Sequence, residues 1–342
     1  MTVSDTSRRA TKSGDPPETP TPPKGRGRFD LFVIIGLLVL TGAGLAALAA
    51  ATGWQDTWDA MLRLSLAQFV FLLFLSLVNY GFRGLRWHLF ARTLGLGTRI
   101  GQDLRHFVGG FAMSVTPGRV GELIRMRWIR RETGWSFERT APLVLVDRAA
   151  DLGAMALILA LSLGLSATAI AGAVPLVALA VAAAVVVTHP ALLGGVATLA
   201  HRLVGVFPRL FARVRAASRS LETFRDPKTM GVALALGIVG WMAEGVAFWL
   251  LLVWLGADIG FWMAVAIFVF ATLAGGLTGA PGGVGGAEAA MIALLTLDGV
   301  SLDVAIAATL IIRLTTFWFA IALGAMVFPM AERRSQAARH AT

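Results

Sequence analysis

Long runs of apolar residues, separated by short charged segments, form the main pattern in this sequence. A bilayer core about 30 Å thick is crossed by about 20 helical residues. Six runs have roughly that length and predict full membrane crossings: residues 29–52, 64–82, 141–165, 167–188, 231–255 and 304–329. The pattern therefore predicts an all-α fold, a polytopic helical bundle in a membrane.

Two further apolar stretches are interrupted by glycine and proline. The stretch 106–118 runs into the sequence TPGRVG, and the stretch 262–297 contains GGLTGAPGGVGG. Glycine and proline interrupt helical hydrogen bonding, and in hydrocarbon such a backbone survives only inside protein or along a cavity. We therefore expect two broken, re-entrant helices beside the six crossings.

The two interruptions resemble each other and suggest an internal repeat. The segment TPGRVGE begins at Thr116 and aligns with APGGVGGAE, which begins at Ala280. An arginine follows the proline of each segment at a similar distance, Arg148 after 31 residues and Arg313 after 32. The basic string RMRWIRRE follows the first copy, whereas the acidic string LDGVSLD follows the second. The copies are therefore expected to enter the membrane from opposite sides, as inverted repeats do in many transporters.

The distribution of lysine and arginine predicts the topology. Of the 30 basic residues, 27 lie in segments 1–28, 83–140 and 189–230 and in the C-terminal tail 331–342. We therefore expect both termini in the cytoplasm of a bacterium, with the chain in its cytoplasmic (inner) membrane. Residues 1–28 are polar and rich in proline, which predicts a disordered tail, and residues 29–330 form the predicted transmembrane domain.

Composition excludes several classes of protein. Of the 342 residues, 56% are hydrophobic and 15% charged, and the mean hydropathy is +0.73, which is typical of a membrane protein. The net charge of +10 comes from residues that flank the apolar runs, so no nucleic-acid partner is predicted. Cysteine is absent, and no H-x-x-x-H, G-x-S-x-G or P-loop motif occurs. We predict no catalytic residue, metal or cofactor, and no enzyme activity.

The glycine-rich interruptions also predict a binding site. Each Pro-Gly pair precedes a helix whose first amides lack intrahelical partners and attract an anion such as phosphate. Arg119 lies in the first interruption, where it either binds phosphate or extends to the membrane interface. The predicted substrate-binding residues are Pro117, Gly118, Arg119, Glu122, Arg148, Asp151, Pro281, Gly282, Glu288 and Arg313.

Charges inside apolar runs need partners, because a central arginine costs roughly 2.5 to 3.5 kcal/mol to insert. Arg148 has Asp147 and Asp151 as neighbours, the latter on the same helical face, and the repeat predicts Glu122 as a further partner. For Arg313 the repeat predicts Glu288. Each pair either lines a substrate path or is purely structural. The central Glu244 is either a proton-coupling group or part of a contact between helices.

The motifs TPGRVGELIR, VLVDRAADL and APGGVGGAEAA, in this order, resemble the flippase-like membrane family named after the transmembrane half of lysylphosphatidylglycerol synthases. The resemblance covers about residues 30–330. It implies lipid translocation without lysyl transfer, because the aminoacylating chemistry of that family belongs to a separate soluble domain.

These observations predict a transporter that moves an anionic, phosphate-bearing lipid between leaflets. The expected partners are a membrane phospholipid or lipid-linked substrate and anionic lipid headgroups. Two alternatives remain open at this stage: a membrane-embedded transferase that acts on a lipid-linked substrate, and a membrane partner subunit without transport activity. The sequence indicates neither the particular lipid nor an oligomeric state.

Overall fold

The computed structural model describes residues 62–114, 120–166, 173–188, 221–224, 226–278 and 280–341, and single residues at 59, 170, 192, 195, 198 and 199. Every regular element in these residues is a helix. The predicted all-α class is therefore confirmed. The predicted crossing 29–52 and the tail 1–28 lie outside the described residues.

The long helices follow most of the predicted apolar runs. Three helices in the described residues are long and apolar enough to cross a membrane: α3 (Leu66–Thr93), α10 (Pro227–Trp254), and the continuous helix formed by α13 (Leu302–Arg313), a π-helical turn (Leu314–Trp318) and α14 (Phe319–Ala341). The run 141–165 lies in α6 (Phe137–Leu165), and 167–188 contains α7 (Ala173–Thr188). The domain boundary expected at residue 330 falls inside α14.

Separate helices lie on the two sides of each interruption. In the first, α4 (Ile100–Gly109) and a 3₁₀ turn (Gly110–Met113) precede α5 (Val120–Thr133). In the second, α11 (Phe261–Leu277) and a 3₁₀ turn (Pro281–Gly283) precede α12 (Gly286–Leu297). A short 3₁₀ turn, Leu221–Phe224, precedes α10. We call α4 and α5 the first hairpin, and α11 and α12 the second hairpin.

Local signals set where two long helices begin. Ser65 and Gln68 form a reciprocal capping box at the start of α3. Asp226 caps α10 by accepting hydrogen bonds from the amides of Lys228 and Thr229, and Pro227 occupies the first helical position. The hydrogen bonds from Thr229 hold the pKa of the Asp226 carboxyl below its ordinary value.

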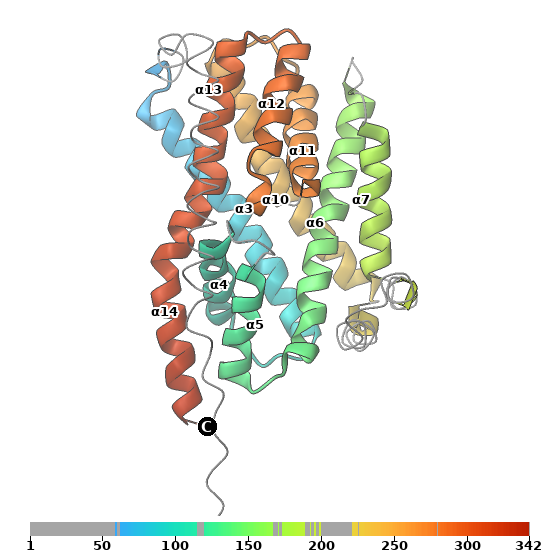
Figure 1. The fold of residues 1–342 in the computed structure, drawn as a ribbon, viewed down its shortest axis with the longest axis vertical. Coiled ribbons are helices and arrows are strands. Elements are labelled where there is room, and N and C mark those ends of the chain that lie inside the picture. The colour runs from blue at the N-terminus through green and yellow to red at the C-terminus, as the bar shows by residue number, and fades with distance from the viewer. Residues whose placement is uncertain are drawn as a thin grey trace, which may run out of the picture.

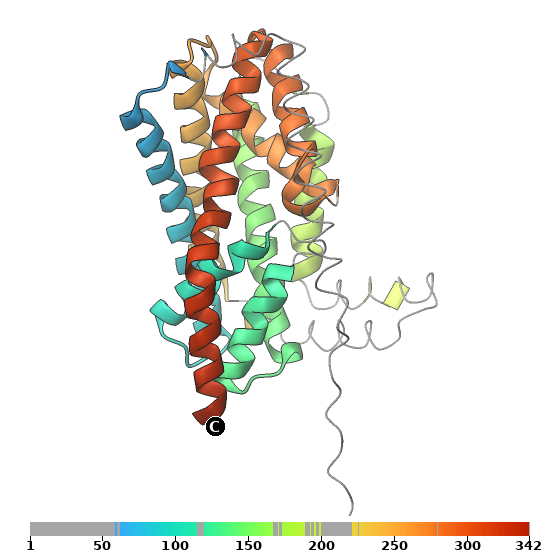
Figure 2. The ribbon, with the colours of Figure 1, turned by 60° about the vertical axis from the view of Figure 1, so that its left-hand side comes forward.

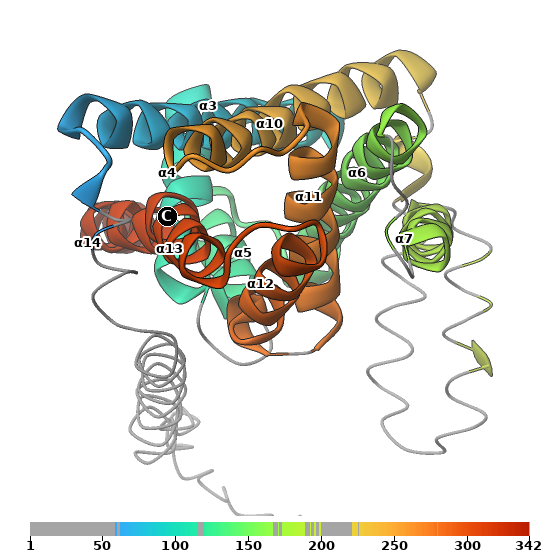
Figure 3. The same ribbon diagram turned by 90° about the horizontal axis from the view of Figure 1, so that it is seen from above.

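The two hairpins lie in opposite halves of the molecule (Figure 1). The first occupies the lower half, the second the upper half, and their broken ends meet near mid-height. The continuous α13–α14 helix runs along both halves, as the turned view also shows (Figure 2). From above, α3 and α10 lie side by side, while α7 lies at the edge next to α6 (Figure 3). The long helices thus hold the two broken ends together at the centre.

The helix that contains the predicted crossing 64–82 is longer than that run, because α3 continues to Thr93. Arg83 and Arg86 were therefore counted with a cytoplasmic segment, although they lie in α3 with exposed fractions of 8% and 0%. The carboxylates of Asp147 and Asp151 on α6 neutralise them, and this allows the helix to continue through two arginines.

Candidate functional site

A cavity of about 230 Å³ lies where the broken ends of the hairpins meet. Its wall combines four arginines and two glutamates with aromatic residues and glycines. It is formed by Tyr80, Arg83, Gly110, Phe111, Met113, Ser114, Gly121, Glu122, Arg125, Arg148, Trp241, Glu244, Phe268, Thr272, Gly276, Gly282, Gly283, Arg313, Thr316, Phe317 and Ala320. Both hairpins and helices α3, α6, α10, α13 and α14 therefore contribute to one polar cavity inside an apolar protein.

The predicted partner of Arg313 is confirmed. Its Nε lies 2.6 Å from Oε1 of Glu288, and its Nη2 donates to the carbonyl of Gly282 at 3.1 Å. The other oxygen of Glu288 accepts a hydrogen bond from the amide of Gly285 at the start of α12. The arginine that ends α13 is thereby tied to the broken end of the second hairpin.

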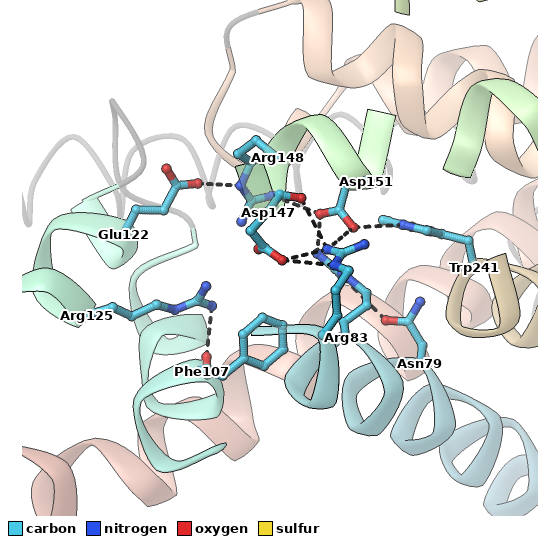
Figure 4. A network of polar contacts seen from close by, with 10 residues as sticks. Asn79, Arg83, Phe107, Glu122, Arg125, Asp147, Arg148, Asp151 and Trp241 are labelled. Carbon is cyan, nitrogen blue, oxygen red and sulfur yellow. Dashed lines mark hydrogen bonds and ion pairs between the residues drawn. The ribbon is translucent and has the colours of Figure 1, made fainter. Parts of the chain in front are cut away.

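The predicted partners of Arg148 are also confirmed. Its Nε lies 2.7 Å from Oε1 of Glu122 on α5, and its Nη1 lies 3.4 Å from Oδ2 of Asp151 (Figure 4). Arg148 therefore joins the first hairpin to α6, much as Arg313 joins the second hairpin to α13. Both arginines line the cavity.

Asp151 and Glu288 are predicted binding residues that are absent from the cavity wall. Asp151 is 4% exposed and Glu288 is 5% exposed. The contacts of Asp151 are the more numerous. Its carboxylate accepts from Arg83 and Arg86 at 2.7 Å each and from Nε1 of Trp241 at 3.0 Å (Figure 4). Its oxygens are thus occupied by residues of α3, α6 and α10, which leaves its predicted role in substrate binding without support from this geometry.

The glycine at the second interruption is required by its surroundings. Gly282 has φ +65°, and a Cβ added there would lie 2.2 Å from the ring of Phe317. It lines the cavity, and its carbonyl faces Arg313. The backbone of Pro281 begins the same turn. The corresponding residues of the first interruption, Pro117, Gly118 and Arg119, lie outside the described residues.

Comparison with known proteins identifies the family. The family model described as the lysylphosphatidylglycerol synthase TM region matches residues 33–324. The chain belongs to this family. Among its relatives are two UPF0104 membrane proteins of Methanothermobacter thermautotrophicus, 29% and 28% identical over 126 and 124 residues. These matches cover 35% and 36% of the chain and 37% of each relative.

A further relative matches over a longer part of the chain. A UPF0104 membrane protein of Methanocaldococcus jannaschii is 22% identical over 227 residues, which are 65% of this chain and 95% of the relative. These archaeal relatives are named as membrane proteins, which agrees with the apolar helices of this family member. The bacterial inner membrane and the orientation of the termini stay predictions.

Sequence reasoning missed several polar residues of this family member's cavity. Arg125 lies one helical turn after Glu122 and therefore shares a face of α5 with it. The predicted inward position of Glu122 could have indicated that Arg125 also points inward. Tyr80 and Arg83 lie near the middle of α3, and the hydroxyl of Tyr80 donates to the carbonyl of Thr316. Nothing in the local sequence separates these inward residues from others on the same long helix.

Glu244 was considered from sequence and lies in the cavity wall. It is 5% exposed, and no hydrogen bond or ion pair reaches its carboxylate from the part of the chain that the structure describes. In that same part, no three histidine, aspartate or glutamate side chains gather as they would around a metal ion. The cavity wall is therefore characterised by arginines and carboxylates, and the arginines can donate hydrogen bonds to an anion.

Proposed function

We propose that this protein moves an anionic, phosphate-bearing lipid between the two leaflets of a membrane. The observation that carries the proposal is the cavity at the meeting point of the two hairpins, with four arginines and two glutamates in its wall. Charged side chains are costly at membrane depth and mark paths for polar substrates. A headgroup crossing here would exchange water for these side chains while its acyl tails stay in the bilayer.

The two ion pairs at the broken ends suggest how the headgroup passes. Each pair joins a hairpin to a neighbouring helix: Glu122 to Arg148, and Glu288 to Arg313. A phosphate group, like a carboxylate, can accept paired hydrogen bonds from an arginine guanidinium. It can therefore replace the glutamate as the partner of the arginine. We therefore propose that each pair opens in turn as the headgroup moves through the cavity.

The arrangement of the hairpins supports a substrate path that opens to the two sides of the membrane in turn. Their broken ends meet from opposite halves of the molecule (Figure 1), and each carries a glycine-rich interruption and an arginine–glutamate pair. Transporters built from inverted repeats place the substrate site at such a meeting point near the membrane midplane. We propose that the hairpins are re-entrant and related as inverted repeats, in a cytoplasmic membrane with both termini in the cytoplasm.

Reconstitution into liposomes tests the function directly. The purified full chain should move a fluorescent phosphatidylglycerol between leaflets faster than protein-free liposomes do, as measured by quenching of the outer leaflet with dithionite. A fluorescent diacylglycerol glycolipid without phosphate should move more slowly. The variant Arg130→Ala is the matched control, because Arg130 is exposed on α5 and absent from the cavity wall. Equal rates with and without the protein for every lipid would overturn the proposal and favour a partner subunit.

A further inference from the structure

Three of the four arginines in the cavity wall have a carboxylate within 2.7 Å. The fourth, Arg125, has none among the described residues. The acidic groups whose charge acts on it, Asp147 and Glu122, are held by Arg86 and Arg148. Arg125 therefore brings a positive charge to the cavity that the neighbouring side chains do not neutralise by direct contact.

The contacts of Arg125 leave two of its nitrogen atoms without an acceptor. The guanidinium carbon lies 4.5 Å from the ring centre of Phe107, 5.3 Å from that of Trp87 and 5.5 Å from that of Phe111. Nη2 donates to the carbonyl of Phe107 at 2.8 Å, whereas Nε and Nη1 have no hydrogen-bond partner among the residues that the structure describes. Aromatic rings attract the positive charge but do not replace an acceptor in the plane of the guanidinium.

The backbone around Arg125 is shaped to hold this side chain in place. A Cβ on Gly110 would lie 2.2 Å from Nε of Arg125, so only glycine lets the guanidinium lie against the 3₁₀ turn. A Cβ on Gly121 would lie 2.4 Å from the carbonyl oxygen of Gly110, which brings α5 close to the same turn. Arg125 is only 3% exposed, and Figure 4 shows it extending from α5 toward α6. The backbone thus fixes the position of the guanidinium, and Nε and Nη1 are covered by protein atoms.

A buried guanidinium with unmet donors is costly, and an anion is the partner that removes this cost. We propose that Arg125 is the residue that first binds the substrate phosphate, with its Nε–H and Nη1–H donating to phosphate oxygens. The inference rests on the proposed function and names the residue that recognises the headgroup. Phosphate binding at Arg125 displaces no carboxylate, but it requires the packing over Nε and Nη1 to loosen. The two ion pairs open afterwards. The shared chemistry is a phosphate group, which a lipid headgroup or free phosphate could supply.

Thermal unfolding of the purified full chain in detergent tests this assignment. The probes are dioctanoyl phosphatidylglycerol, inorganic phosphate and dioctanoylglycerol, which lacks phosphate. The phospholipid should raise the Tm of the wild type and of Arg130→Ala. In Arg125→Met the concentration needed for the same shift should rise roughly tenfold to a hundredfold, as expected for a lost hydrogen bond to a charged group. Arg125→Lys keeps the charge but lacks the forked guanidinium, so the concentration that it needs should lie between those of the wild type and Arg125→Met. This variant replaces Arg125→Met in the test if the methionine variant does not fold.

The probes separate the two sources of phosphate. A shift with the phospholipid alone assigns the site to a lipid headgroup, and an Arg125-dependent shift with inorganic phosphate assigns it to the free ion as well. Equal phospholipid shifts in the wild type, Arg125→Met and Arg125→Lys would overturn the inference, even if the wild type moves lipid in liposomes. An Arg125-dependent shift together with no lipid movement by the wild type would instead overturn only the proposed function. Protection by dioctanoylglycerol equal to that by the phospholipid would also contradict phosphate recognition.

Discussion

At the scale of single residues, the charges of the cavity are buried but not equally paired. Arg313 has a glutamate, a carbonyl and the ring of Phe317 around it. Arg125 has aromatic rings and one carbonyl. A buried pair weakly favours folding, whereas removing one member leaves an uncompensated charge. Single and double substitutions therefore distinguish structural charges from those that serve the substrate.

The first prediction concerns the pair of Arg313 and Glu288. Arg313→Ala leaves Glu288 buried without its partner, which typically costs about 3 to 5 kcal/mol of folding stability. The double variant Arg313→Ala with Glu288→Ala removes the unpaired charge and should recover much of the Tm. If Arg313 contacts the headgroup during crossing, the stable double variant stays inactive in the liposome assay. Recovery of lipid movement in the double variant would contradict that role.

The second prediction concerns the turn at Gly282. Alanine there meets both a positive φ and the ring of Phe317, so Gly282→Ala should lower the Tm and slow lipid movement. Strain of this kind costs of order 1–3 kcal/mol. Gly276→Ala is the matched control, since Gly276 also lines the cavity but has open space around an added Cβ. Equal loss of stability in both variants would show that the turn is not under this constraint.

At the scale of elements, one buried network joins three long helices. Asp151 of α6 binds Arg83 and Arg86 of α3 and Trp241 of α10. Gly237 of α10 permits this approach, because a Cβ there would lie 2.9 Å from Nη1 of Arg86. The network forms a rigid frame beside the cavity, against which the two hairpins are positioned.

The third prediction compares the two aspartates of this network. Asp151→Ala should destabilise the protein by about 3 to 5 kcal/mol, because Arg83 then has no carboxylate partner among the described residues. Asp147→Ala should cost less, because Arg86 keeps Asp151. Unfolding by denaturant in detergent measures the order of the two variants. A larger loss for Asp147→Ala would contradict the central place given to Asp151.

At the scale of the whole molecule, an apolar exterior surrounds a central cavity with charged residues in its wall. Large apolar side chains are exposed on the outer helices, among them Leu66 of α3, Leu161 of α6 and Val174 of α7, as expected for surfaces that face lipid. The carboxyl ends of α5 and α12 lie at opposite ends of the molecule (Figure 1). The proposed topology therefore places the carboxyl ends of α5 and α12 on opposite sides of the membrane.

The fourth prediction tests that topology in this chain without cysteine. In intact cells, Asp298→Cys should react with a membrane-impermeant maleimide, whereas Arg130→Cys should react only after the membrane is permeabilised. A third at Arg215→Cys, outside the described residues, should behave like Arg130→Cys, since both lie in basic segments expected in the cytoplasm. Labelling of 130 and 298 from the same side would refute inverted hairpins.

The sequence by itself determined the features that depend on neighbouring residues. Run length and hydropathy identified most of the helices, and glycine and proline marked both interruptions, because backbone hydrogen bonding is a local property. The similar spacing of the two interruptions was enough to pair Arg148 with Glu122 and Arg313 with Glu288. An arginine in an apolar run needs a partner, and the predicted repeat indicated where that partner lies.

Only the tertiary structure decided which other charges are buried. Arg83 and Arg86 appear as the start of a basic segment, and the carboxylates that neutralise them lie more than 60 residues away on α6. Arg125 belongs to a strongly basic string, yet it alone among that string's arginines lines the cavity. Burial of a charge depends on the electrostatic surroundings that several helices create together, and no local pattern records them.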